Sequence, residues 1–387
     1  MRRIKHSFPR VLTLLLAALL LSASCSGCMK SLELNERILI QAIGIDADGD
    51  AYKFTLQAFM SESGSGDTGF DPSQSNTRII TVYGRTISEA LSNVALLQGK
   101  EAFYGQNKYI AIGRGVAGDD IMRVLSFFNS NNQSRAGTDV VMADGEAAEL
   151  VGLPLAGSIS AALSVRRMLE HDTVYGKLRR STLMDITNAD KNGLIGVSLP
   201  ILAPIPGESD SDNTIYCRGT ALFRDGKFTG ELNTYQTRGL MWVTENIDSS
   251  IVAFIDNDNI DLAAVKVKRV SAKLDAVIVE GIPHFRITLE ATGSLTELLL
   301  KSDKPASTDD VASIERYVGE YIAREIENAY GVIVRQNGCD LYRLAEWLKK
   351  HHSGYWKEHS EYWADIMPQT TLTADVDLTI NRFDLKN

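Results

Sequence analysis

Cysteine is scarce in this sequence: four occur in 387 residues, and two of them, Cys25 and Cys28, lie near the amino terminus. No CxxC pair stands beside a second pair of metal ligands, which argues against a structural zinc site. The Cys25–Cys28 spacing matches CxxC but follows an apolar run, so it does not indicate a redox motif. Cys217 and Cys339 can pair in an oxidising compartment if the fold brings them together, and the sequence alone does not decide this.

Basic residues are outnumbered. The chain has 40 Lys and Arg against 49 Asp and Glu, a formal net charge of −9. Residues 1–27 contain four basic and no acidic residues, so the remainder carries −13. Nucleic-acid binding needs clustered cations, so this composition argues against nucleic acid as a partner. It also argues against electrostatic docking of the folded body on anionic lipid, which leaves the amino terminus to hold the protein on a membrane.

One long apolar run is present, Val11–Leu21, and it follows basic residues at positions 2, 3, 5 and 10. Eleven helical residues span only ~16 Å, too short for the ~30 Å hydrocarbon core. Small residues then lead to Cys28, so residues 1–27 are predicted to be a signal peptide. The small-small-Cys ending resembles the bacterial lipobox, with Cys28 as the lipidated residue. Cys25 occupies the position where the lipobox usually has Leu, and it remains the alternative.

Motifs that carry chemistry are missing or lack their context. There is no GxSxG elbow. Gly64–Gly69 matches GxGxxG, but Pro72 follows and no helix is indicated, so a flexible loop is the better interpretation. Asp46–Asp50 resembles the start of a calcium loop but has Ala51 and Gln57 where Gly and Glu are needed, so a hairpin turn is predicted. A group of surface side chains, His351, His352, His359, Glu358 and Glu361, lacks HExxH spacing. No catalytic, cofactor or metal site is therefore predicted.

Hydrophobic periodicity predicts alternating strands and helices. An N-terminal α/β domain is expected over 28–206, the polar and acidic segment 207–213 is interpreted as a linker, a middle domain is expected over 214–272, and a C-terminal α+β domain over 273–387. The last of these begins with a strand alternating at Phe285, Ile287 and Leu289. It continues with an amphipathic helix after the N-cap signal Ser307–Asp310 and ends in a strand through Leu378.

The mature chain resembles the Ger(x)C family, the lipoprotein C subunits of spore germinant receptors. The resemblance rests on Glu33-Leu34, on the strand Ala42-Ile-Gly-Ile-Asp46 with its hairpin returning through Gln57, on Gly219–Phe223 and on Thr237–Trp242. It implies an elongated α+β fold of three domains, each a mixed or antiparallel β-sheet flanked by helices. It also implies attachment to the outer face of the cytoplasmic membrane, which is the spore's inner membrane. The implied partners are two integral-membrane receptor subunits, of the A and B type.

The expected function is therefore that of an accessory, non-enzymatic subunit of a nutrient germinant receptor, without a cofactor, anchored through Cys28. The alternative is an extracytoplasmic lipoprotein that binds a solute or a cell-wall fragment. That alternative shares the anchor but predicts a deep cleft between two lobes.

Overall fold

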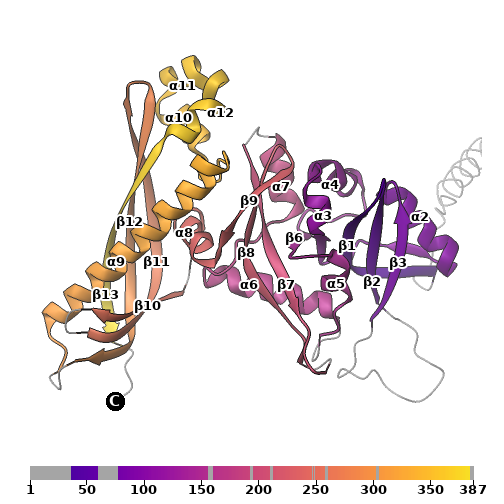
Figure 1. The fold of residues 1–387 in the computed structure, drawn as a ribbon, viewed down its shortest axis with the longest axis horizontal. Coiled ribbons are helices and arrows are strands. Elements are labelled where there is room, and N and C mark those ends of the chain that lie inside the picture. The colour runs from indigo at the N-terminus through magenta and orange to yellow at the C-terminus, as the bar shows by residue number, and fades with distance from the viewer. Residues whose placement is uncertain are drawn as a thin grey trace, which may run out of the picture. The chain divides into compact units, whose positions relative to one another are not determined.

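The computed structural model describes residues 36–59, 77–155, 160–191, 195–209, 212–245, 247, 249–257, 260–301 and 305–383. Residues from Ile38 onward form one compact unit. Two β-sheets organise it, and Figure 1 shows both with their helices.

The first sheet is mixed and has nine strands. Their bounds are β1 (Arg37–Asp48), β2 (Ala51–Phe59), β3 (Thr77–Gly84), β4 (Glu101–Phe103), β5 (Tyr109–Ile112), β6 (Asp139–Ala143), β7 (Val197–Ile205), β8 (Thr214–Arg224) and β9 (Lys227–Asn233). The spatial order is β3-β2-β1-β5-β6-β7-β8-β9, with β4 pairing with β1. Strands β1, β5, β6 and β7 are parallel, and antiparallel hairpins extend the sheet on both sides.

Helices cover both faces of the parallel strands. One face packs against α2 (Ile87–Gln98), α3 (Arg114–Ala117), α4 (Ile121–Ser130) and α7 (Leu183–Lys191), and the other against α5 (Ala147–Gly152) and α6 (Ala161–Val174). Strand β5 shows why: Ile110 and Ile112 enter the first core, whereas Tyr109 and Ala111 enter the second. Successive side chains of a strand point to opposite faces, so a fully apolar strand requires a cover on each.

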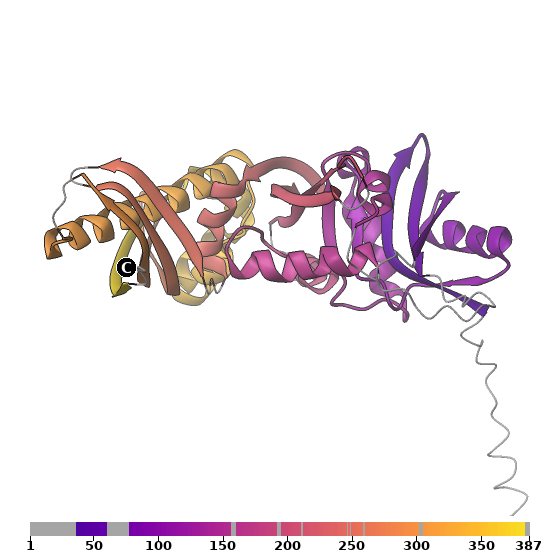
Figure 2. The same cartoon turned by 90° about the horizontal axis from the view of Figure 1, so that it is seen from below.

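The second sheet has the order β10-β11-β12-β13. Its strands are β10 (Ser250–Asn257), β11 (Ile260–Val279), β12 (Ile282–Leu300) and β13 (Thr371–Phe383), and β13 returns parallel to β12. Helix α9 (Thr308–Tyr330) lies along one face, as Figures 1 and 2 show, and buries the stripe Ile314, Val318, Ile322 and Ile326. The chain then passes through η3 (Gly331–Gln336), α10 (Leu344–His351), α11 (Ser353–His359), η4 (Ser360–Tyr362), α12 (Trp363–Ile366) and η5 (Met367–Gln369).

Helix α8 (Thr234–Thr244) joins the two sheets in the chain and packs against α9. Its N-terminus is a capping box, in which Asn233 accepts from the Gln236 amide and the Gln236 side chain accepts from the Asn233 amide. The α+β class predicted from the sequence is confirmed, with two sheets flanked by helices.

The structure differs from the sequence interpretation of residues 207–213. This segment connects β7 to β8, which pair antiparallel from Ile205↔Thr214 to Val197↔Phe223. The expected boundary at 272/273 likewise falls inside β11. A polar segment is expected to be exposed to water. A hairpin loop within one sheet is as exposed as an interdomain linker, so polar composition does not distinguish the two.

Candidate functional site

The predicted lipidation residue, Cys28, lies outside the described residues, as do Cys25 and the glycine-rich Gly64–Gly69 motif. Among the described residues, no helix is both long and apolar enough to cross a bilayer.

The predicted surface histidines stack on aromatic rings. His351 lies 4.7 Å from the Trp347 ring and His359 lies 4.2 Å from the Tyr355 ring, both in stacked geometry. Within the described parts of the chain, no three His, Cys, Asp or Glu side chains are grouped as metal ligands. Cys217 and Cys339 form no disulfide, and burial raises the pKa of the Cys339 thiol to about 11, which keeps it protonated and unreactive at neutral pH.

The family-like residues Asp46 and Gln57 hold the ends of α5. The buried Asp46 carboxylate accepts from the amides of Ala147 at 2.6 Å and Ala148 at 2.9 Å. Gln57 donates to the Val151 carbonyl at the other end of α5, and its amide oxygen accepts from the Ala162 amide at the start of α6. Burial raises the pKa of Asp46, and the two amide donors oppose that rise. Asp46 is thus a helix cap, whereas Asp48 and Asp50 stand in the exposed hairpin turn.

The family-like segment Thr237–Trp242 lies in α8, which packs against α9. We call this contact the α8–α9 junction (Arg238, Gly239, Trp242 and Glu325). Glu325 accepts from Arg238 through both carboxylate oxygens, at 3.0 and 2.5 Å, and from the Trp242 indole at 2.9 Å. Both charged side chains are largely buried. A buried ion pair of this geometry leaves a costly unpaired charge when either partner is removed, so it favours one packing of the two helices.

A hydroxyl pair joins α8 to the first sheet. Thr220 on β8 and Thr237 on α8 are both buried and lie 3.0 Å apart through their Oγ1 atoms. The blocks Gly219–Phe223 and Thr237–Trp242, which are 14 positions apart, are therefore adjacent in space. Their residues form the contacts that connect β8 to α8 and α8 to α9.

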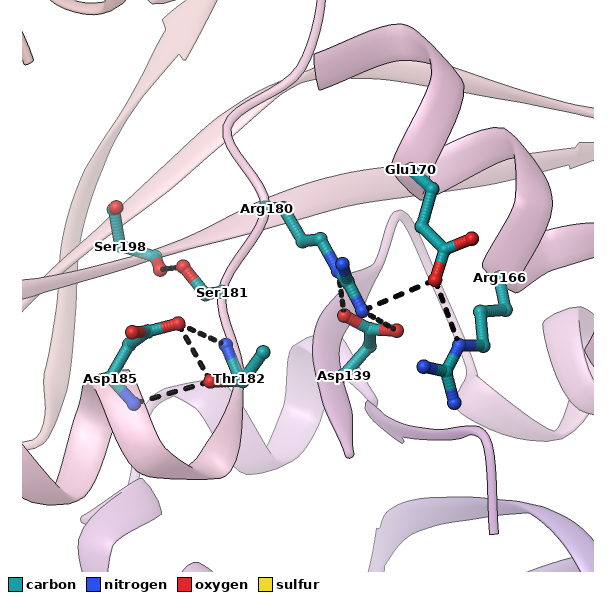
Figure 3. Close-up of polar contacts among 8 residues, drawn as sticks. All are labelled: Asp139, Arg166, Glu170, Arg180, Ser181, Thr182, Asp185 and Ser198. Atoms are coloured by element: carbon teal, nitrogen blue, oxygen red, sulfur yellow. Dashed lines mark hydrogen bonds and ion pairs between the residues drawn. The ribbon is translucent and has the colours of Figure 1, made fainter. Parts of the chain in front are cut away.

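A charged network occupies the start of β6 (Figure 3). Asp139 is completely buried and accepts from Arg180 at 2.5 and 3.1 Å. Glu170 on α6 lies between Arg166 and Arg180, at 3.0 and 3.7 Å. Burial raises the pKa of Asp139, and the Arg180 donors counteract that rise. These contacts fix the segment before α7 against the sheet, together with the Thr182–Asp185 cap and the Ser181 hydroxyl bonded to the Ser198 carbonyl.

A second network lies beyond the carboxyl ends of β5 and β6. Arg114 and Arg218 each contact both Asp144 and Glu231, and all four side chains are partly exposed. The charges balance within the group, and it ties the parallel strands to the β8–β9 hairpin.

These networks were not predicted from the sequence, because their partners are far apart along the chain: 87 positions for Arg238 and Glu325 and 41 for Arg180 and Asp139. The sequence marked some of these residues only through the family-like segments. Those segments contain Asp46, Gln57, Thr220, Thr237, Arg238 and Trp242. Their shared property in the structure is a buried polar contact between elements.

Comparisons with known proteins cover both halves of the chain. Residues 30–204 match the family model "Spore germination protein N-terminal domain", and residues 218–384 match "Spore germination B3/GerAC like, C-terminal". The chain is 21% identical to spore germination protein B3 of Bacillus subtilis (strain 168) over 370 residues, covering 94% of this chain and 96% of that protein. It is also 21% identical to spore germination protein YndF of the same organism, covering 98% of each.

The crystal structure of the GerBC protein matches the fold with a TM-score of 0.58 at 19% identity, covering 87% of this chain and 96% of that one. Two family models in the expected order, relatives matched over nearly their whole length and a common fold agree. The chain belongs to the Ger(x)C family of spore germination proteins.

Proposed function

We propose that this protein is the lipid-anchored C-type subunit of a nutrient germinant receptor, and that it acts beside integral-membrane A- and B-type subunits on the outer face of the spore's inner membrane. The observation that carries the proposal is the position of Cys28 relative to the family match. The family's N-terminal domain begins at residue 30, two positions after the lipobox cysteine. Cleavage before Cys28 would leave the matched domain intact with an acylated residue directly in front of it.

The interior of the folded body supports a role without catalysis. Its buried carboxylates accept from helix amides or arginines: Asp46 and Asp340 cap helices, and Asp139 and Glu325 bind guanidinium groups. Each therefore has a structural task already. We infer that the protein works through its surface and its position on the membrane rather than by turnover of a substrate.

The test is isolation of the chain, tagged after Asn387, from gently solubilised spore membranes, with identification of the associated proteins by mass spectrometry. We expect two multi-spanning receptor-type subunits to accompany the wild type. The Cys28→Ala variant should lose the acyl mass, membrane retention and both partners, and nutrient-triggered germination should slow. Cys25→Ala is the matched control and should behave as the wild type.

Each other outcome has a definite meaning. Loss of the anchor in Cys25→Ala but not in Cys28→Ala would move the lipidation to Cys25. Retention of both variants on membranes would contradict the lipid anchor. Recovery of the wild type with transporter components instead of receptor subunits would favour the solute-binding alternative.

A further inference from the structure

The amino ends of the parallel strands in the first sheet carry a row of cations. Strands β1, β3, β5 and β6 run in the same direction, because β1, β5 and β6 are parallel and β3 is related to β1 by two antiparallel pairings through β2. Arg78 is the second residue of β3, Lys108 precedes β5 and Arg135 lies in the turn before β6. We call these three residues the amino-end row.

The row lies at one level of the sheet. Arg78 pairs through Ala58 with Ile40 on β1, and the Lys108 amide donates to the Gln41 carbonyl at 2.8 Å. The cations of neighbouring strands are therefore presented together at one end of the sheet.

Lys108 is the most constrained member of the row. Its side chain is half-buried, and within the described residues no carboxylate forms an ion pair with it. Burial lowers the pKa of Lys108, and the nearby Arg166 and Arg135 lower it further. The acids beside it are already engaged, because Asp139 binds Arg180 and Glu170 lies between Arg166 and Arg180 (Figure 3). The exposed Glu36 precedes β1 in the chain.

The opposite end of the same strands carries exposed acids. Asp48 ends β1 and Asp50 lies in the turn after it, whereas Asp144 and Glu146, which follow β6, are paired with arginines and with Lys53. The net charge of −9 averages over these two ends, so an acidic composition is compatible with a local cationic surface. An anionic surface would attract the amino end and repel the carboxyl end.

The tether leaves the sheet from its cationic end. Cys28 precedes Arg37 by nine residues, and nine residues span at most ~32 Å when fully extended. Headgroup charge acts within a Debye length of ~8 Å at physiological salt. A lipid at Cys28 would therefore hold the amino-end row close to the bilayer. The tether raises the effective concentration of headgroups around the row, so a contact that is weak on its own can form.

We propose that the amino-end row docks on anionic lipid headgroups and orients the folded body on the membrane, with the acidic carboxyl ends of the strands facing away. This rests on the proposed lipid anchor at Cys28. The anchor holds the protein at the membrane, and the row sets which face meets the bilayer.

The experiment is hydrogen exchange followed by mass spectrometry on the mature lipidated chain in vesicles of phosphatidylcholine with or without phosphatidylglycerol. We expect exchange in peptides covering 104–108 and 131–138 to slow several-fold when the anionic lipid is present, and to recover at high salt. Peptides covering 46–50 and 144–149 should not change. The double variant Arg78→Glu/Arg135→Glu should lose the protection.

The matched control is Arg85→Glu/Arg123→Glu, which changes the net charge equally. It reverses exposed arginines after β3 and in the first turn of α4, at the carboxyl end of the strands. This variant should keep the protection. Equal loss in both double variants would mean that net charge, and not the row, controls docking, and would overturn the proposal.

Other outcomes separate the anchor from the docking. A lipidated chain that stays on both kinds of vesicle but shows no difference in exchange would overturn the docking proposal and leave the anchor standing. A chain that leaves both vesicles would refute the anchor. The same protection produced by inorganic phosphate without vesicles would make the row a phosphate site and would also overturn membrane docking.

Discussion

Asp340 is an acid from which the fold excludes water. Its carboxylate accepts from the amides of Leu344 at 2.7 Å and Ala345 at 2.9 Å and so caps the first turn of α10. Burial raises its pKa from 3.8 to about 6, and the amide donors only partly oppose that rise. The residue therefore links the stability of the second sheet's helical cover to pH.

The direction of this linkage follows from the two protonation states. The folded protein keeps a proton on Asp340 up to about pH 6, whereas the unfolded chain releases it near pH 4. Between these values the folded state binds more protons, so the unfolding free energy falls as pH rises. The full loss is roughly 3 kcal/mol, because one pKa unit corresponds to about 1.4 kcal/mol.

We predict that Asp340→Asn removes this contribution. The unfolding free energy of the wild type minus that of the variant should decrease between pH 4 and pH 7, as measured by urea unfolding at each pH. Asp119→Asn, which removes a carboxylate at an exposed position, is the control variant measured in the same way. A constant difference for Asp340→Asn would show that its carboxyl group titrates normally in the folded protein.

At the scale of elements, short local signals explain several boundaries of the secondary structure. Ser307 caps α9, as the predicted N-cap signal requires, and in the same way Thr86 caps α2 and the Asp225-Gly226 turn joins β8 to β9. Each signal acts within four residues, so it is readable without the fold. The 20-residue strand β11 was not predicted at its full length, because its central residues are exposed and lack the apolar alternation of β12.

Contacts between elements were not readable in the same way. The small-small-Cys ending at Cys28 is a local motif, and so a lipidation site could be predicted there from the sequence alone. The α8–α9 junction pairs Arg238 with Glu325, and no spacing rule connects residues so far apart. The sequence does show a glycine, Gly239, between Arg238 and Trp242, which both bind Glu325. The structure explains why a residue without a side chain stands at this position.

Gly239 lets α8 approach α9. A Cβ at this position would collide with the Glu325 carbonyl oxygen and approach the Ala329 Cβ. We predict that Gly239→Ala destabilises the protein by about 1–3 kcal/mol through overpacking, although alanine is the better helix former by about 1 kcal/mol. Urea unfolding at neutral pH measures the change.

Gly354 in α11 supplies the matched control, because a Cβ there meets no atom within 4 Å. Gly354→Ala should leave stability unchanged or raise it slightly. If Gly239→Ala also stabilises, the two helices are not in close contact and the junction is wrong.

At the scale of the whole molecule, the family models divide the chain near residues 204–218, whereas the first sheet runs across that division. Strands β7 and β8 pair along nine positions on either side of the 207–213 segment. The Thr220–Thr237 contact and the α8–α9 junction then continue the connection into the second sheet. We therefore predict that the two sides of this sequence division do not behave as separable bodies.

The full chain can be cut in the 207–213 segment if a protease recognition sequence is inserted after Ser209. Cleavage should leave the two fragments associated in native buffer, because the paired strands bury Leu199, Ile201, Ala221 and Phe223 in one core. They should elute together in size-exclusion chromatography and separate only in urea. Fragments that separate in native buffer would mean that 207–213 is a true interdomain linker, and that the nine-stranded sheet does not hold the two halves together.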